Sequence, residues 1–320
     1  MRAMGSSQPG FKAILPVDIP PAALGAGQLR VQVIASALNP ADLLVQRRAL
    51  AGRLLHSTKP PLVPGYDFSG VVTEVGTGAE GCAAGDEVFG HLAYSSRTSQ
   101  GACAETIVVD AAAVAKKPAG IDHAQAACAA TTGLTALQFL RDLGKLTRGQ
   151  RLLVLGAAGG VGTCAVGIGK RLGAHVTAVC SGYAVAHVQK LGADVVIDRA
   201  RQDPLASATP YDVIFDTTAT YSYLRAARVL APAGVFITTL PGPGLVVGKL
   251  ATLFSKRRCV FGAVKSRRAD LEQLGTWLAG GLLVPIYQRF PVREVVAGLE
   301  RFAGGRLLGR IAIDVKDGFY

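Results

Sequence analysis

The sequence lacks the features typical of membrane proteins, of secreted proteins and of proteins stabilised by a structural metal. No eighteen consecutive residues are all apolar. The most apolar region, residues 229–254, contains three prolines and several glycines, which argues against a membrane span. The first residues show no basic segment followed by an apolar core, so we expect no secretory signal and a cytoplasmic protein. The six cysteines form no C-x-x-C pair, a pattern typical of free thiols rather than of disulfides or a structural zinc.

Acidic residues are scarce relative to basic ones. The formal net charge is +12 and the isoelectric point is about 9.7, which favours either a polyanionic partner or a solvated basic surface. The basic residues form short clusters such as Arg47–Arg48 and Arg267–Arg268, without interleaved aromatics and without a nucleic-acid-binding motif. We therefore interpret the charge as an arginine-rich surface and expect no nucleic-acid partner.

The most informative stretch is a glycine-rich turn. Leu152–Leu155 is a short apolar run, typical of a strand buried in a parallel sheet. It leads into the sequence G-A-A-G-G-V-G and then into a small-residue helical segment, Thr163–Leu172. In such a strand–turn–helix unit Gly159 lets the backbone approach a pyrophosphate, and Gly162 lets the helix pack on the strand. Because Ala157 replaces the first fingerprint glycine, a tight turn in another doubly wound protein is the alternative.

Strands and helices continue to alternate after this turn. We expect strands at 175–180, 194–197, 211–216, 235–240 and 260–264, and helices at 184–191 and 223–230. This alternation predicts a parallel sheet with helices on both faces and a ligand at the carboxyl ends of the strands.

The flanking segments are rich in β-structure and glycine. We expect strands at 29–35, 101–109 and 308–315, and helices at 122–130, 134–143, 270–278 and 292–302. The two helices at 122–143 are expected to be separated by a break at Thr131-Thr132-Gly133, and Asp42 is expected to cap a short helix after Pro40. The predicted fold class is α/β, with a nucleotide-binding part and a β-rich part.

Several motifs agree in order and spacing with one family. They are N-P-A-D at 39–42, P-G-Y-D-F-S-G at 64–70, G-D-E-V-F-G at 85–90, G-A-C-A-E at 101–105, T-T-G-L-T-A at 131–136, A-A-G-G-V-G at 157–162, L-G-A-D-V-V-I-D at 191–198 and L-G-R-I-A-I-D-V at 308–315. With them the chain resembles the zinc-independent quinone oxidoreductases of the medium-chain dehydrogenase/reductase superfamily. The resemblance implies a Rossmann NADP-binding domain at 122–263, inserted into a GroES-like, β-rich catalytic domain formed by 1–121 and 264–320. Similar reductases are often dimers, so we expect a homodimer.

The same resemblance implies that no metal is bound. Zinc-dependent relatives hold the catalytic ion with a cysteine, a histidine and a second cysteine, and the corresponding positions here are Asn39, Tyr66 and Cys128. Of these three positions only Cys128 keeps a zinc ligand, whereas a catalytic zinc needs about three protein ligands. We interpret Cys128 as a buried thiol.

The cofactor is expected to be NADPH. The strand at 175–180 is followed by Ser181 and has no Asp or Glu at its end, where NAD-specific sites carry an acid. Ser181 and Arg199 are expected to bind the 2′-phosphate, since a guanidinium suits a phosphate; a plain surface arginine is the alternative for Arg199. The resemblance implies further cofactor contacts by Thr132, Ala158, Gly159, Gly160, Val161, Tyr183, Thr217, Leu240, Pro241, Phe261 and Ala263.

The implied reaction is hydride transfer to a small quinone or α,β-unsaturated carbonyl. Asn39 is expected to polarise the carbonyl, Tyr66 to hydrogen-bond it or donate a proton, and Asp67 to edge the pocket. Each has an alternative role: a turn residue, a packed aromatic and a residue that holds the turn, respectively. Two other functions stay open. One is an enoyl-thioester reductase, although residues 43–55 lack the tyrosine of those relatives. The other is an NADPH-binding redox sensor or scaffold with little turnover.

Overall fold

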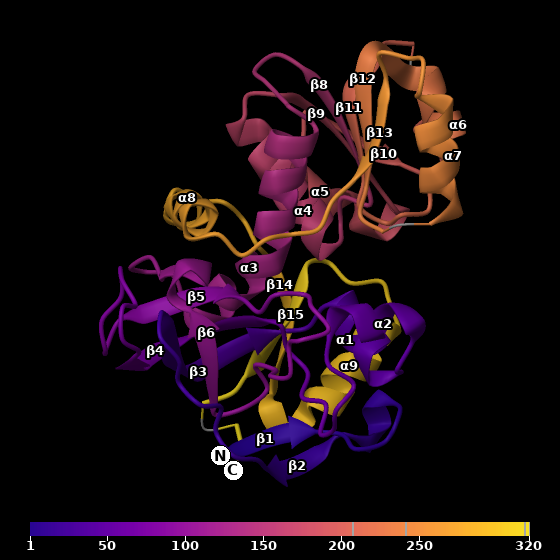
Figure 1. The fold of residues 1–320 in the computed structure, drawn as a ribbon. Coiled ribbons are helices and arrows are strands. Elements are labelled where there is room, and N and C mark those ends of the chain that lie inside the picture. The colour runs from indigo at the N-terminus through magenta and orange to yellow at the C-terminus, as the bar shows by residue number, and fades with distance from the viewer. Residues whose placement is uncertain (207, 241, 317, 320) are drawn as a thin grey trace. The chain divides into compact units, whose positions relative to one another are not determined.

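The computed structural model describes residues 1–206, 208–240, 242–316 and 318–319. The chain divides into two compact units (Figure 1). The first contains residues 1–131, 265–281 and 285–320, and the second contains residues 132–264 and 282–284. Residues 122–131 thus belong to the first unit, whereas the sequence placed them in the nucleotide-binding domain.

The second unit is built on a parallel sheet. Its strands are β8 (Arg151–Leu155), β9 (His175–Cys180), β10 (Val195–Asp198), β11 (Tyr211–Asp216), β12 (Leu230–Thr238) and β13 (Arg258–Phe261). They are ordered β10-β9-β8-β11-β12-β13, which is the order of a Rossmann fold. Leu152–Leu155 is fully buried in the centre of the sheet, as its apolar run predicted. The chain order reverses between β8 and β11, and the glycine turn follows β8.

Helices cover this sheet (Figure 1). They are α4 (Gly160–Arg171), α5 (Val185–Gln189), α6 (Tyr223–Ala226) and α7 (Pro243–Ala251). The sequence did not predict α7, because its prolines and glycines indicated interruption; Pro243 stands instead at the start of the helix, where proline is tolerated. The strand expected at 235–240 begins at Leu230, and an irregularity in its pairing with β11 accommodates Pro232.

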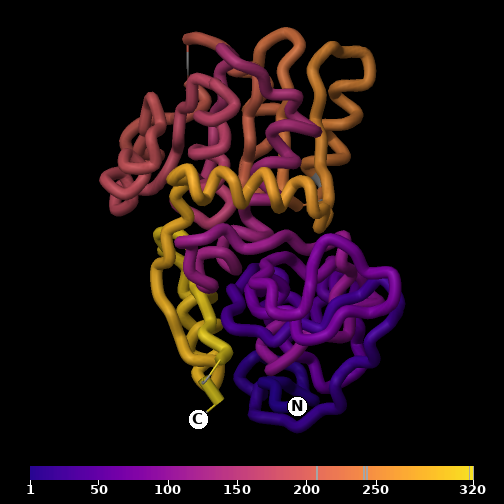
Figure 2. Tube along the Cα trace, turned by 90° about the vertical axis from the view of Figure 1, so that its left-hand side faces the viewer, coloured from indigo at the N-terminus to yellow at the C-terminus, as the bar shows by residue number. Residues whose placement is uncertain are grey.

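The first unit contains a mixed sheet that joins both parts of the chain. Its strands are β3 (Gln28–Ala37), β4 (Asp67–Val75), β5 (Glu87–His91), β6 (Thr106–Asp110), β7 (Val114–Lys116), β14 (Ile286–Pro291) and β15 (Arg310–Asp314), and β1 (Arg2–Gly5) pairs with β2 (Leu15–Asp18) beside it. β15 lies antiparallel to β3, so the C-terminal segment, yellow in Figure 2, completes a sheet begun near the N-terminus. The sequence missed β14. Gly101–Glu105 is not a strand, because this segment bonds through its backbone to Pro64 and Gly65 instead.

Five α-helices of the described chain complete this unit or lead out of it. They are α1 (Pro40–Gln46), α2 (Leu50–Leu55), α3 (His123–Gln138), α8 (Arg268–Ala279) and α9 (Val295–Ala303). The expected break at Thr131-Thr132-Gly133 is wrong: α3 runs through it, since buried packing and a hydrogen bond from Thr131 outweigh weak helix propensity. The N-cap of α1 is Asn39, and Asp42 occupies the third helical position of a capping box.

Candidate active site

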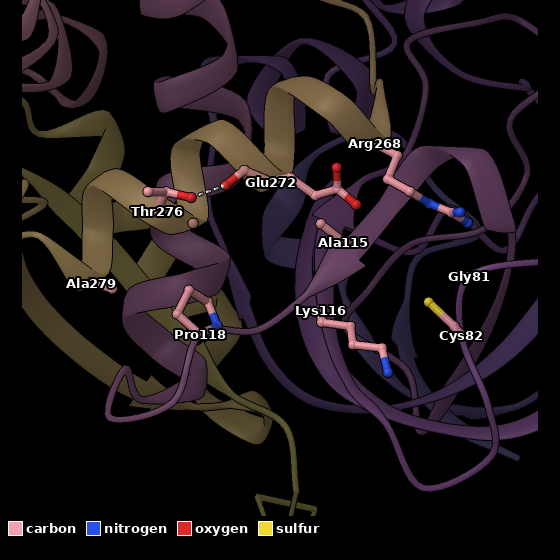
Figure 3. Close-up of a pocket in the computed structure, with 10 residues that line it drawn as sticks. Gly81, Cys82, Ala115, Lys116, Pro118, Arg268, Glu272, Thr276 and Ala279 are labelled. Carbon is pink, nitrogen blue, oxygen red and sulfur yellow. Dashed lines mark hydrogen bonds between the residues drawn. The ribbon is translucent and has the colours of Figure 1, made fainter.

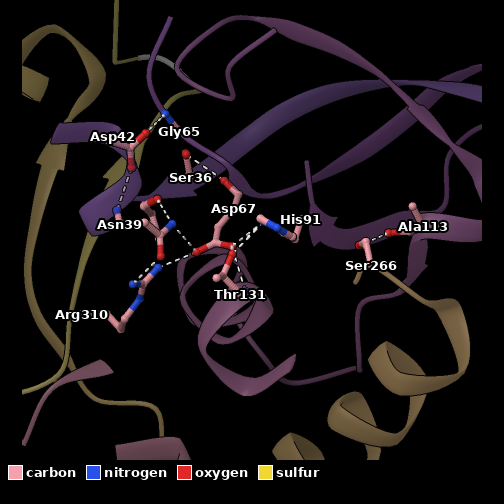
Figure 4. Close-up of polar contacts among 11 residues, drawn as sticks. Ser36, Asn39, Asp42, Gly65, Asp67, His91, Ala113, Thr131, Ser266 and Arg310 are labelled. Carbon is pink, nitrogen blue, oxygen red and sulfur yellow. Dashed lines mark hydrogen bonds and ion pairs between the residues drawn. The ribbon is translucent and has the colours of Figure 1, made fainter. Parts of the chain in front are cut away.

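Asp67 is the centre of a buried polar network in the first unit (Figure 4). It begins β4 and is fully buried. One carboxylate oxygen accepts the N–H of Thr131 at 2.8 Å and also its hydroxyl. The other accepts the amide N–H of Asn39 at 3.0 Å and a guanidinium N–H of Arg310. Arg310 also donates to Oδ1 of Asn39 at 2.9 Å. Three segments far apart in sequence are therefore tied to one carboxylate.

A second carboxylate joins two of the sequence motifs. Asp42 accepts the backbone N–H of Asn39 at 2.7 Å with one oxygen and that of Gly65 at 2.7 Å with the other. Burial raises the pKa of Asp42 to about 6, against these hydrogen bonds. The residues N-P-A-D and P-G-Y-D thus form one hydrogen-bonded unit, which fixes Tyr66 and Asp67 relative to Asn39.

His91 extends the network from the end of β5. The hydroxyl of Thr131 donates to Asp67, so its oxygen accepts from Nδ1–H of His91 at 2.8 Å. Burial lowers the pKa of His91 to about 4, which keeps the ring neutral near pH 7. Its Nε2 is buried and has no hydrogen-bond partner among the described residues.

Tyr66 lies among other aromatic and imidazole rings. Its hydroxyl donates to the carbonyl of Leu55 at 3.0 Å, and Nδ1 of His56 lies 3.1 Å from the same oxygen. The ring centroid of Tyr94 lies 4.6 Å away. Burial, together with the charge of Asp42, raises the pKa of Tyr66 above its ordinary range, so the phenol keeps its proton. Burial also lowers the pKa of His56 to about 4.

The glycine turn of the second unit leaves the N-terminus of α4 open. Gly159 is the N-cap of α4, so the N–H groups of the first turn have no partner inside the helix. A Cβ built on Gly159 would meet only the carbonyl oxygen of Gly156, at 3.7 Å, whereas one on Gly162 would lie 2.2 Å from that oxygen. The turn therefore leaves open space at Gly159 and close packing at Gly162, which fits a pyrophosphate at the helix N-terminus.

Ser181 and Arg199 meet at the ends of neighbouring strands. Nε of Arg199 donates to the hydroxyl oxygen of Ser181 at 3.1 Å, and its backbone N–H bonds to Cys180. Asp198 lies close by, but it accepts the N–H of Ala200 at 3.0 Å and lies 3.7 Å from the guanidinium of Arg201. A guanidinium and a hydroxyl thus stand where an NAD-specific site would carry an acid.

The other predicted cofactor residues differ in position. Thr217 directly follows β11 and donates to the carbonyl of Leu155 at 2.8 Å, beside the glycine turn. Thr132 is buried in α3, where the thiol of Cys164 donates to its hydroxyl at 3.5 Å. Exposure is high at Tyr183, Leu240 and Ala263, low at Ala158, and intermediate at Gly160, Val161 and Phe261. Pro241 lies outside the described residues.

Comparisons with known proteins agree with this arrangement. Residues 25–119 match the alcohol dehydrogenase GroES-like domain, and residues 191–313 match the zinc-binding dehydrogenase family. The human mitochondrial NAD(P)H oxidoreductase RTN4IP1 is 38% identical over 89% of this chain and 81% of its own length. The trans-enoyl reductase pgmF of Aspergillus terreus is 30% identical over 92% of this chain and 88% of its own length. The quinone oxidoreductase of Coxiella burnetii superposes with a TM-score of 0.89 at 27% identity, covering 98% of this chain and 99% of that one.

The chain belongs to the quinone oxidoreductase family of the medium-chain dehydrogenase/reductase superfamily. This oxidoreductase therefore has the predicted fold, a Rossmann domain with a GroES-like domain. Within the part of the chain that the structure describes, no cluster of three His, Cys, Asp or Glu side chains is placed to hold a metal. Nor is any described helix both long and apolar enough to span a bilayer.

Sequence reasoning missed several residues of the network in this oxidoreductase. Arg310 lies inside the motif L-G-R-I-A-I-D-V, and a lone cation in an apolar strand was a usable signal for a buried partner. At Thr131 the sequence indicated only a helix break. His56, His91 and Tyr94 carried no local signal, because their positions depend on how distant loops pack.

Proposed function

We propose that this oxidoreductase uses NADPH and, without zinc, reduces a quinone or an α,β-unsaturated carbonyl. The contact between Ser181 and Arg199 supports NADPH most directly, because it joins a hydroxyl to a guanidinium and no acid ends β9. NADPH, when bound, supplies the hydride. The named relatives support the substrate class: one is a quinone oxidoreductase and another is a trans-enoyl reductase.

The chain's own residues divide this work between holding the cofactor and handling a proton. The first turn of α4 and Gly159 hold the pyrophosphate, and Ser181 with Arg199 holds the 2′-phosphate. Tyr66 stays protonated, because burial raises its pKa, and its hydroxyl becomes the hydrogen-bond or proton donor to the substrate once it leaves the carbonyl of Leu55.

Asn39 and Asp67 act by positioning. The amide N–H groups of Asn39 are directed at Asp67 and at the carbonyl of Ala37, at 3.0 Å and 3.4 Å, and its oxygen accepts from Arg310. Polarising a substrate carbonyl would require one of these bonds to break. Both oxygens of Asp67 are likewise engaged. We therefore assign them to fixing the turn that carries Tyr66.

The decisive experiment pairs binding with turnover. NADPH and NADH are titrated by fluorescence, and NADPH oxidation is then followed with 9,10-phenanthrenequinone and simple enones. Selective NADPH binding with turnover supports the proposal. Equal binding of both nucleotides refutes the role of Ser181 and Arg199, and absence of binding refutes the nucleotide site itself.

An enoyl thioester is the second candidate substrate. The similarity to the trans-enoyl reductase favours it, and Tyr66 would replace the tyrosine missing from residues 43–55. Crotonyl-coenzyme A and its longer homologues in the same assay separate the two: faster turnover of thioesters than of quinones selects the enoyl reductase. Nucleotide binding without turnover of any acceptor would leave the redox sensor or scaffold.

We also propose a homodimer in a reducing, cytoplasmic environment. Val246, Leu250, Leu253 and Phe254, on and just after α7, are more than half exposed, and a second copy of the chain would cover them. None of the six cysteines forms a disulfide, and five of them are buried, which suits a reducing compartment. Light scattering tests the first proposal; a monomer at micromolar concentration would refute it.

A further inference from the structure

A cavity beside α1 and α2 is lined by two arginines that have no carboxylate partner among the described residues. It measures about 320 Å³ and is lined by Val45, Arg48, Gly52, Arg53, His56, Ser57, Thr58 and Leu62. Val45 and Leu62 are buried apolar residues. The polar lining consists of two guanidinium groups, an imidazole and two hydroxyls, and it contains no carboxylate.

The surrounding sequence offers no compensating charge. Between Asp42 and Asp67 the chain has Arg47, Arg48, Arg53 and Lys59 and no acidic residue. Arg48 donates one Nη2 hydrogen bond to the carbonyl of Ser7 at 2.8 Å, but its Nε is buried with no partner among the described residues. A buried donor without an acceptor is unfavourable, so it points to a missing hydrogen-bond acceptor.

The end of α1 fixes the place of Arg48. Arg48 follows the C-cap Arg47 with a φ of +50°, and the N–H groups of Arg48 and Ala49 bond to the carbonyls of Val45 and Leu44 at 2.9 and 3.1 Å. These bonds form a Schellman helix ending, which holds the Arg48 side chain beside the cavity.

We propose that this cavity binds the phosphate group of a small phosphorylated molecule. Guanidinium groups bind phosphate with charge-assisted hydrogen bonds, and the serine and threonine hydroxyls offer further donors. The volume is near the lower end of small-molecule sites, roughly 300–1,000 Å³, so a phosphate with a small organic group fits. The residues of this site belong to the first unit, whereas the proposed contacts with the cofactor's phosphates belong to the second.

Another cavity shows what a cation-lined pocket looks like when its charges are satisfied. It measures about 400 Å³ and is lined by Gly81, Cys82, Ala115, Lys116, Pro118, Arg268, Glu272, Gly275, Thr276 and Ala279 (Figure 3). Lys116 pairs with Asp86 at 2.9 Å, and Arg268 donates to the carbonyls of Glu80, Ala111 and Val114. Glu272 adds a negative charge. This pocket is therefore not selective for anions.

The proposed site lies next to Tyr66. His56 lines the cavity, and its Nδ1 lies 3.1 Å from the hydroxyl of Tyr66. One imidazole ring thus separates the proposed phosphate from the residue to which we assign proton donation.

The test is a calorimetric titration of the protein saturated with NADP⁺, which fills the cofactor's own phosphate site. The probes are inorganic phosphate, glycerol 3-phosphate and phenyl phosphate. We expect saturable binding of at least one probe, weakened tenfold or more by Arg53→Gln and by Arg48→Gln. The matched control is Arg47→Gln, because Arg47 has the same charge but its guanidinium lies 5.8 Å from the ring centroid of Phe11 and does not line the cavity; we expect less than a twofold change.

Each outcome decides the proposal. No binding of any probe, or equal weakening by Arg47→Gln, overturns it. Tighter binding of a monoester than of inorganic phosphate identifies an organic phosphate as the ligand, and equal binding identifies free phosphate. If Arg48→Gln does not fold, Arg53→Gln decides alone, because that side chain is exposed. If NADP⁺ does not bind, the proposed function fails, and the same titration on an Arg199→Gln background still tests this site.

Discussion

Replacing Arg310 with Met removes the only cation that hydrogen-bonds to Asp67 in the described structure. Both side chains are buried, with 4% and 0% exposure for Arg310 and Asp67, respectively. The substitution keeps most of the apolar stem but leaves a buried carboxylate uncompensated, and it also removes the donor to Oδ1 of Asn39. Breaking a buried ion pair in this way costs about 3–5 kcal/mol. We expect a loss of that size in the free energy of unfolding.

The assay is urea unfolding followed by the fluorescence of Trp277, the single tryptophan, which lies on α8 in the same unit. Arg289→Met is the matched control, because its partner Asp122 is exposed and the pair contributes about 0–1 kcal/mol. The double variant Asp67→Asn with Arg310→Met should lose less than the sum of the single variants. A loss below about 1 kcal/mol for Arg310→Met would refute the assignment of this pair as the support of the site.

Four further predictions concern the cofactor, the metal and pH. Arg199→Glu should weaken NADPH binding at least tenfold more than NADH binding; equal weakening would show that this arginine does not read the 2′-phosphate. Gly162→Ala should displace α4 and cost about 1–3 kcal/mol together with nucleotide affinity, because its Cβ would lie 2.2 Å from the carbonyl oxygen of Gly156; an unchanged affinity would contradict this packing. Activity should survive exhaustive chelation, and a loss restored by zinc would overturn the proposal of a zinc-free enzyme. Because burial lowers the pKa of His91 to about 4, the unfolded state binds more protons below pH 6.5, and stability falls as the pH drops from 7 to 5. His91→Gln should reduce that fall in stability by about 2 kcal/mol. Asp42, whose pKa is raised, makes stability rise as the pH drops, and it does so equally in the wild-type protein and in the variant. An unchanged pH dependence of stability in His91→Gln would refute a neutral buried imidazole.

The sequence predicted all six strands of the nucleotide-binding half, though not the helix α7. Its strands are mostly apolar, and β9 and β11 have the bounds that the sequence predicted. The prediction succeeds because a parallel strand buried on both faces is largely apolar, and because each βα unit is local in sequence. Ser181 and Arg199 could likewise be selected in advance, since the carboxyl ends of neighbouring parallel strands meet at one edge.

The β-rich half was harder to predict because its pairings are not local. Gly101–Glu105 alternates like a strand, yet its backbone bonds to the turn at Pro64 and Gly65. Thr131-Thr132-Gly133 has the composition of a helix break, yet α3 continues because Thr131 bonds to Asp67. In both cases a contact with a distant segment outweighs the local preference.

By itself the sequence determined the fold class and the family, and it selected the sheet edge at which we propose that the nucleotide binds, because these follow from periodicity and from motifs confined to short stretches. Only the tertiary structure decided what Asp67 does. Its partners Asn39, Thr131 and Arg310 come from three distant segments, and no local pattern says which cation a buried carboxylate will find. The cation-lined cavity beside α2 depended on the structure for the same reason: whether an arginine has a partner is a property of the packed chain.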